Sequence, residues 1–154
     1  MEARTLTSEW AEWTDANIPD LDAVAQRQQF ESYMCTLWSE VKASIVASIA
    51  MVNKHLTSAS QIECADSPGG GLALTRWSEY PVALLDVSID LEAATLACIY
   101  SCAAREGDQY RELRKTWAIT AADGGLVATD EAGESITTSD EIGRMIVEAY
   151  LANL

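Results

Sequence analysis

The sequence has few positive charges, one histidine, one phenylalanine and three prolines. Its 10 lysine and arginine residues are outnumbered by 24 aspartates and glutamates, which gives a net charge of −14 at pH 7. Because nucleic-acid phosphates and anionic membranes attract positive protein surfaces, this balance argues against both as partners. It is compatible with a basic protein partner and also with solubility alone.

The negative charge is concentrated at the two ends of the chain. Residues 1–22 contain six acids and one base, and residues 123–154 contain seven acids and one base, so the ends carry −5 and −6 of the total of −14. We interpret them as the solvated ends of a folded core, since charge runs usually mark solvated surfaces. The alternative is that the two ends form one acidic surface for a cationic partner.

The sequence has no long apolar run and no recognisable leader. Its first ten residues, MEARTLTSEW, lack an apolar segment, and its longest apolar run, Ala43–Val52, is about half as long as a membrane helix. We therefore expect a cytoplasmic protein in which the cysteines stay reduced. Cys98 and Cys102 form a C-x3-C pair, but Cys35 and Cys64 are isolated, so we expect core thiols and no metal site.

No catalytic constellation is recognisable either. His55, the single histidine, lies at the C-terminal end of a predicted long helix, where a basic side chain is favourable regardless of function. There is no G-x-S-x-G motif, and Pro68–Gly71 lacks the Gly-Lys-Ser/Thr ending of a phosphate loop. The acidic segment Asp86–Asp90 is followed by leucine and not by the glycine of a calcium loop. We expect no catalytic residue and no cofactor.

The strongest pattern that is present predicts a long helix from about Glu31 to Leu56, without internal proline or glycine. The helix could begin earlier, because Pro19 suits a first turn and Asp20 and Asp22 suit a helix N-terminus. Its buried face recurs at three- and four-residue steps and consists of Met34, Leu37, Trp38, Val41, Ile45, Ser48, Ile49, Val52 and Leu56. Between Ala43 and Val52 the sequence ASIVASIAMV has no charge on any side. A helix that is apolar all round is covered all round, so we expect a sheet on one side and a second cover on the other.

The second cover that we expect is an acidic N-terminal arm, residues 1–18, which precedes a single domain of residues 19–154. In the arm, Leu6, Trp10 and Trp13 are spaced i, i+4, i+7 and would share one side of a short helix. Each indole would contribute on the order of a few kcal/mol of apolar burial. The face that the arm would cover consists of Val46, Ala47, Ala50 and Met51.

The middle of the sequence predicts a run of antiparallel strands. Apolar and polar residues alternate most clearly in Val82–Asp90, which predicts one buried and one solvated face. We expect further strands at Gln61–Ala65, Leu72–Glu79, Tyr110–Thr120 and Leu126–Thr129. The segment Leu91–Ala104 fits a helix or a strand; we choose a strand after a turn at Asp90–Ala94.

The chain ends with a helix that begins at a capping box, in which Thr138 and Glu141 satisfy each other's free amides. The predicted fold class is therefore α+β. An antiparallel sheet meander packs against a long central helix and a C-terminal helix, in a two-layer sandwich.

Two functions fit this reading. The first is a non-catalytic interaction module (an acidic adaptor, chaperone-like or assembly protein) that binds a protein partner or a second copy as a homodimer, with Leu6, Trp10 and Trp13 as anchors. The second is a small-ligand binder or enzyme with a pocket between helix and sheet, lined by Trp38, Trp77, Tyr100 and Trp117. The basic residues Arg105, Arg111, Arg114 and Lys115 are expected to pair with neighbouring acids.

Overall fold

A computed structural model describes residues 21–58, 60–76, 82–122 and 125–152. The chain divides into two compact units, residues 1–32 and residues 33–154, and the boundary falls inside helix α2, Leu21–Asn53. In the first unit, the described residues are the first turns of α2, where Arg27 Nε lies 3.1 Å from Glu31 Oε1. The sheet and the C-terminal helix belong to the second unit.

The described part of the second unit contains seven strands that pair antiparallel in sequence order, which makes the sheet a meander. They are β1 (Glu63–Asp66), β2 (Leu72–Arg76), β3 (Val82–Asp90), β4 (Thr95–Ala103), β5 (Arg111–Ala122), β6 (Gly125–Thr129) and β7 (Ser135–Ile136). The sequence predicted the first six within two residues at the ends that the structure describes. It missed β7, which is too short to show a pattern.

Strand β3 shows why this sequence forms a sheet with one buried face. Leu85 and Val87 are buried, whereas Asp86 between them is exposed. Successive side chains of a strand point to opposite faces, so the buried residues define an inner face and Asp86 an outer face. The cross-strand register extends the inner face to both sides, because Leu85 lies opposite Leu74 of β2 and Tyr100 of β4.

The ambiguous segment Leu91–Ala104 forms a turn and then β4, which confirms the strand prediction. Asp90 Oδ1 accepts hydrogen bonds from the backbone N–H groups of Glu92 and Ala93, each at 3.0 Å. Ala94 adopts a left-handed conformation, with φ of 53°. An aspartate that bonds the backbone beyond it favours a turn over a continuing helix.

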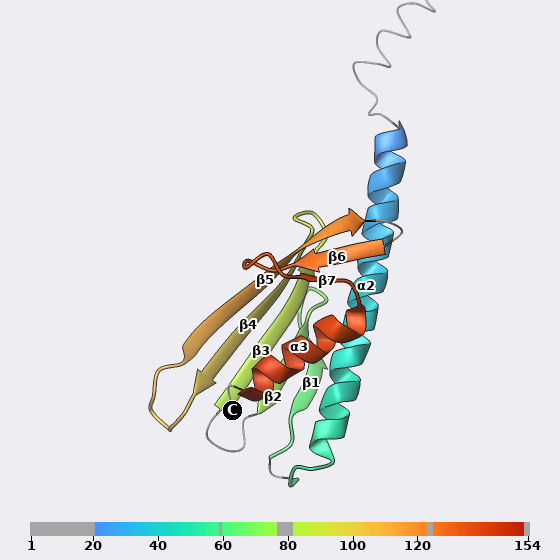
Figure 1. Cartoon of the computed structure of the whole chain (residues 1–154). Helices are drawn as coiled ribbons and strands as arrows, with labels where there is room; N and C mark the ends of the chain where they lie inside the picture. Colours follow the sequence, from blue (N-terminus) through green and yellow to red (C-terminus); the bar gives the residue numbers. More distant parts are fainter. Residues whose placement is uncertain (1–20, 59, 77–81, 123–124, 153–154) are drawn as a thin grey trace, which may run out of the picture. The chain divides into compact units, whose positions relative to one another are not determined.

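Helix α2 and helix α3 (Ser139–Ala152) pack against the sheet, α3 across its middle (Figure 1). Within residues 33–53, α2 buries Met34, Val41, Ile45 and Ile49, at the steps that the sequence predicted. At its C-terminal end the side chain of Asn53 both accepts a hydrogen bond from Ile62 N and donates one to Ile62 O, each 2.9 Å long.

The start of α3 is the predicted capping box in part, because Thr138 Oγ1 accepts a hydrogen bond of 3.3 Å from Glu141 N. The helix then buries Ile142, Gly143, Ile146, Val147 and Tyr150. Tyr150 reaches the sheet, where its hydroxyl donates to Ala83 O at 2.8 Å. The α+β arrangement of a meander with a long helix and a C-terminal helix is confirmed.

The cysteines differ from the prediction of four core thiols. All four are free; Cys98 is buried, Cys64 and Cys102 are half-buried, and Cys35 is exposed. Cys35 lies on α2 one position after Met34, on the side that turns away from the sheet. The helical pattern places it there, so the general preference of cysteine for burial is overridden by its position.

Candidate functional site

The outer side of α2 is the first candidate for a functional surface. Five small or apolar residues there are exposed, and we call them the α2 outer face: Ala43, Val46, Ala47, Ala50 and Met51. Val46 is 43% exposed and Met51 is 66% exposed. The sequence predicted that this side is covered, but within the described residues it is open to solvent. The residues predicted to cover it, Leu6, Trp10 and Trp13, lie outside the described residues.

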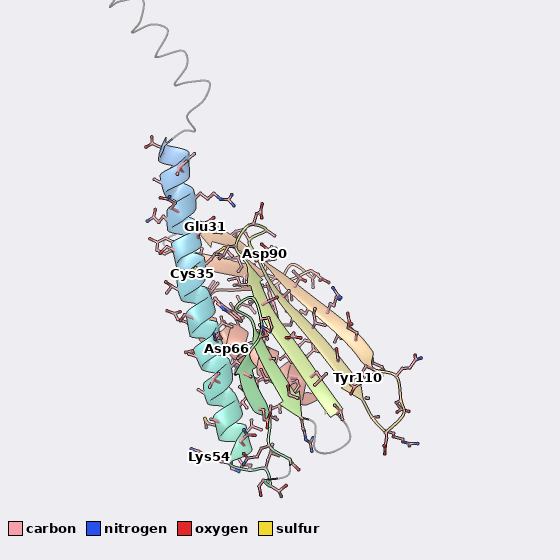
Figure 2. All side chains as sticks on the ribbon, turned by 180° about the vertical axis from the view of Figure 1, so that it is seen from behind. Glu31, Cys35, Lys54, Asp66, Asp90 and Tyr110 are labelled. Atoms are coloured by element: carbon pink, nitrogen blue, oxygen red, sulfur yellow. The ribbon has the colours of Figure 1, made fainter. Side chains whose placement is uncertain are left out.

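Charged side chains border the α2 outer face but do not enter it. Lys42 Nζ lies 2.7 Å from Asp66 Oδ1 of β1, on the flank toward the sheet; Asp66 is labelled in Figure 2. Glu40 Oε2 accepts a hydrogen bond of 2.9 Å from Ser139 Oγ at the start of α3. By length and composition alone, α2 from Asp22 to Asn53 could cross a membrane. One such helix is weak support for a span, since core helices of soluble proteins have the same composition.

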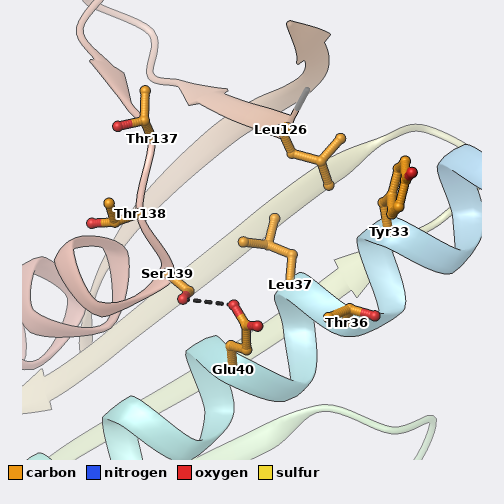
Figure 3. Close-up of a pocket in the computed structure, with 9 residues that line it drawn as sticks. Tyr33, Thr36, Leu37, Glu40, Leu126, Thr137, Thr138 and Ser139 are labelled. Carbon is orange, nitrogen blue, oxygen red and sulfur yellow. Dashed lines mark hydrogen bonds between the residues drawn. The ribbon is translucent and has the colours of Figure 1, made fainter. Parts of the chain in front are cut away.

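A pocket of about 500 Å³ lies beside α2, on the side of β6 and of the segment that leads into α3. It is lined by Tyr33, Thr36, Leu37, Glu40, Gly125, Leu126, Thr137, Thr138 and Ser139. Leu37 and Leu126 point toward one another across it (Figure 3). Tyr33 lies at one end of the pocket, and the hydrogen bond between Glu40 and Ser139 lies at the opposite end. The pocket offers hydroxyl groups and one carboxylate around a small apolar centre.

The structure describes three of the four aromatic residues predicted for the alternative pocket, namely Trp38 on α2, Tyr100 on β4 and Trp117 on β5. Trp77 lies outside the described residues. Trp38 is half-buried and donates its indole N–H to Gly70 O at 3.1 Å. Trp117 is buried on the inner face, beneath Lys115 Nζ at 5.1 Å from its ring centre. Tyr100 is buried too, but it lines a second hollow together with Cys102, Arg111, Glu112 and Leu113.

The buried titratable groups are held in their neutral forms. Burial raises the pKa of the Cys98 thiol to about 12 and outweighs a hydrogen bond with Tyr100 and the charge of Lys115, which both lower it. Burial likewise raises the pKa of Tyr150 to about 12. A thiol with such a pKa is a poor nucleophile at neutral pH. Within the described residues no cluster of three or more His, Cys, Asp and Glu side chains could hold a metal.

The second candidate surface is an open edge of β5, which sequence reasoning missed. β5 pairs with β4 from Arg111 to Ala118, but with β6 only from Ala118 to Ala122. In the part of the chain that the structure describes, no strand pairs with the other edge of Arg111–Lys115, which we call the β5 free edge (Figure 1). The feature of the sequence that could have revealed this edge is the length of β5, which is more than twice that of β6.

The basic residues of this region pair as the sequence predicted at two positions. Arg114 Nε lies 2.7 Å from Glu112 Oε1 on the outer face, and Lys115 Nζ lies 3.9 Å from Asp130 Oδ2 on the inner face. Leu113 lies between Glu112 and Arg114 in the sequence, but its side chain is on the inner face and is 57% exposed. Beside it is the second hollow, of about 390 Å³, lined by Tyr100, Cys102, Arg111, Glu112 and Leu113.

No protein-family model matches the chain, and no curated protein or solved structure is significantly similar to it.

Proposed function

We propose that the protein is a non-catalytic interaction module, an acidic adaptor whose α2 outer face binds an amphipathic, cationic helix of a partner protein. The observation that carries this proposal is the exposure of Val46 and Met51 on a helix side that has no charge from Ala43 to Val52. Isolated exposed apolar residues are ordinary on protein surfaces, but a contiguous stripe of them favours an interaction site.

The chemistry of the partner follows from the shape and charge of this surface. Three of the five residues of the α2 outer face are alanines, whose side chains are short. A second helix can therefore approach the backbone of α2 closely and insert larger side chains beside Val46 and Met51. A partner helix would contact this face through apolar residues at positions i, i+3 or i+4, and i+7. The net charge of −14 attracts a partner with lysine or arginine on its flanks and speeds their encounter.

The N-terminal arm provides a second part of the proposed contact. Leu6, Trp10 and Trp13 remain the predicted anchors, and they lie outside the described residues. Tryptophan is enriched among the residues that carry most of the energy of protein interfaces. The acids Glu9 and Glu12 in the same segment suit a cationic partner.

A fluorescent helical peptide of leucine and lysine, patterned as an amphipathic helix, serves as the probe. Its affinity is measured by anisotropy for the full chain, for Val46→Glu, and for the control Thr120→Glu at an exposed site of β5. Both variants add one negative charge, so a purely electrostatic attraction would tighten equally in both. We expect Val46→Glu to weaken binding about tenfold or more, because a carboxylate would be buried in an apolar contact, and Thr120→Glu to leave it unchanged.

Deletion of residues 1–18 tests the arm in the same assay. We expect weaker peptide binding together with an unchanged melting temperature of the remaining chain. Equal affinity of the Val46→Glu and Thr120→Glu variants would contradict the proposed site. Equal affinity of a matched leucine–glutamate peptide would contradict the cationic partner.

The second candidate function, a small-ligand binder, is supported by the pocket of about 500 Å³ beside α2. Its hydroxyl groups and the carboxylate of Glu40 suit a small polar ligand with an apolar part. A metabolite screen by thermal shift would detect such a ligand. Leu126→Trp, which fills the pocket, should abolish the shift without lowering the melting temperature of the protein alone.

A further inference from the structure

The β5 free edge presents unpaired backbone groups in a known direction. Ile119 donates its backbone N–H to Ala94 O at 2.8 Å, on the side of β4. N–H and C=O groups alternate between the two edges of a strand, so those of the odd-numbered residues of β5 point toward β4. Those of Glu112 and Arg114 therefore point outward from the sheet, where no strand within the described residues meets them.

We infer that the β5 free edge pairs antiparallel with the same edge of a second copy of this chain, about a two-fold axis at Leu113. In this register Leu113 lies opposite Leu113 of the second copy, and Glu112 lies opposite Arg114 on both sides of the axis. The inner faces of the two sheets then lie on the same side, as a continuous sheet requires. This interface is separate from the α2 outer face and does not depend on the function proposed for it.

The backbone geometry suits this register. Glu112 and Arg114, whose N–H and C=O groups point outward, become hydrogen-bonded pairs, each with two N–H···O=C bonds. Leu113 becomes a non-hydrogen-bonded pair, the kind in which opposed side chains lie closest. Its side chain is 57% exposed in the single chain, beside the hollow of about 390 Å³, so pairing would bury apolar surface at the axis.

The charges select this register over its neighbours. With the axis at Leu113, two Glu112–Arg114 pairs form on the outer face, next to the Glu112–Arg114 pair of 2.7 Å that each chain already contains. A shift of the axis by one residue, to Arg114, would place the two Arg114 side chains opposite each other. Charged edge strands usually resist pairing. Here the opposite signs at positions 112 and 114 make the edge complementary to itself.

One contact in this register is unfavourable. Arg111 lies opposite Lys115 of the second copy, on the inner face, although the carboxylate of Asp130 lies 3.9 Å from Lys115 and offsets part of the repulsion. Reversal of the charge at position 111 should therefore strengthen the dimer.

The experiment measures the dimer dissociation constant by analytical ultracentrifugation for the full chain and for four variants, one of them a control. Glu112→Arg should weaken the dimer by about tenfold or more, because two attractive pairs become repulsive. The double variant Glu112→Arg with Arg114→Glu should restore it. Arg111→Glu should tighten the dimer, because the Arg111–Lys115 contact becomes attractive. Glu92→Arg, an exposed site in the β3–β4 turn, is the matched control and should leave it unchanged.

The expected changes in dimer affinity are opposite to those that the total charge of the chain alone would cause. Glu112→Arg lowers the net charge from −14 to −12 and would help two acidic chains associate, whereas Arg111→Glu raises it to −16 and would hinder them. A chain that is monomeric at every concentration, or a Glu112→Arg variant that behaves like Glu92→Arg, would overturn the inference. Circular dichroism of each variant shows that the sheet is intact.

A cross-link tests the axis itself. In a Cys35→Ser background, Leu113→Cys should form a disulfide between two chains, because the Cα atoms of a non-hydrogen-bonded pair lie about 4.5 Å apart, within the range that a disulfide spans. Glu112→Cys is the control, since position 112 lies opposite position 114 and not opposite itself. Efficient cross-linking at position 112 and none at position 113 would place the axis elsewhere and contradict this register.

Discussion

Helices α2 and α3 pack on the same sheet, but their outer sides differ in kind. The exposed residues of α3 include Asp140, Glu141, Arg144 and Glu148, and Arg144 Nε lies 3.9 Å from Glu148 Oε1. The exposed residues of α2 from position 43 to position 51 are the alanines, valine and methionine of the α2 outer face. Both helices bury large aliphatic residues toward the core.

The difference shows that burial against the sheet does not account for the composition of α2. An amphipathic helix such as α3 is complete when one side is buried and the other is solvated. By the same rule α2 has one apolar side more than the described fold uses. Its inner side packs against the sheet and stabilises the chain, whereas its outer side adds no comparable burial within the described residues.

The largest expected effect separates the two sides of α2. Ile45 is fully buried, and its neighbour Val46 is 43% exposed. Ile45→Ala should lower the free energy of unfolding by about 2–5 kcal/mol, whereas Val46→Ala should change it by about 0.5 kcal/mol or less. In α3, Ile146→Ala and Arg144→Ala should give the same contrast. Urea denaturation of the four variants measures it.

A large loss of stability in Val46→Ala would contradict the difference between the inner and outer sides of α2. It would mean that the α2 outer face is covered in the isolated chain, and α2 would then be a helix buried on both sides. A small loss in Ile45→Ala would be equally damaging, since it would remove the basis for the inner packing of α2.

The next effect concerns the contact between the two helices. Gly143 of α3 is buried, and a Cβ placed on it would lie 2.7 Å from Ser44 Cβ and 2.5 Å from Ser44 Oγ of α2. Gly143→Ala should therefore destabilise the chain by about 1–3 kcal/mol through overpacking, even though alanine favours a helix more than glycine does.

Removal of the opposing side chain is the control for this contact. Ser44→Gly takes away the two nearest atoms that the new methyl group would meet and leaves Val41 O at 3.4 Å, so the double variant should be more stable than the sum of the two single effects. Additive effects in denaturation experiments would show that α2 and α3 are farther apart than the structure has them.

Local signals in the sequence predicted the elements, and they failed where the outcome depends on distant residues. The alternation in Val82–Asp90 predicted β3, and Thr138 with Glu141 predicted the start of α3, because each signal acts within a few residues. The exposure of Val46 could not be predicted this way, since a helix sequence does not say whether a cover exists. The β5 free edge depends on where β6 stops pairing, which the pairing of Ala122 with Gly125 alone does not fix.

The smallest expected effect tests how α3 is attached to the sheet. Tyr150→Phe removes the 2.8 Å hydrogen bond to Ala83 O and should lower the free energy of unfolding by about 1 kcal/mol at neutral pH, where the hydroxyl is protonated in both states.

The pKa of Tyr150 rises from 10.0 to about 12 in the folded chain. Above pH 10 the unfolded chain loses this proton first, so the stability from Tyr150 is present below pH 10 and is lost as the pH rises toward 12. Cys98, whose pKa rises from 9.0 to about 12, adds a similar loss that begins near pH 9. The stability of the unaltered chain should therefore fall from pH 9 upward, and Tyr150→Phe should fall less steeply above pH 10. Parallel curves for the two proteins would show that the Tyr150 hydroxyl is not held in the core, and α3 would then be attached by its aliphatic residues alone.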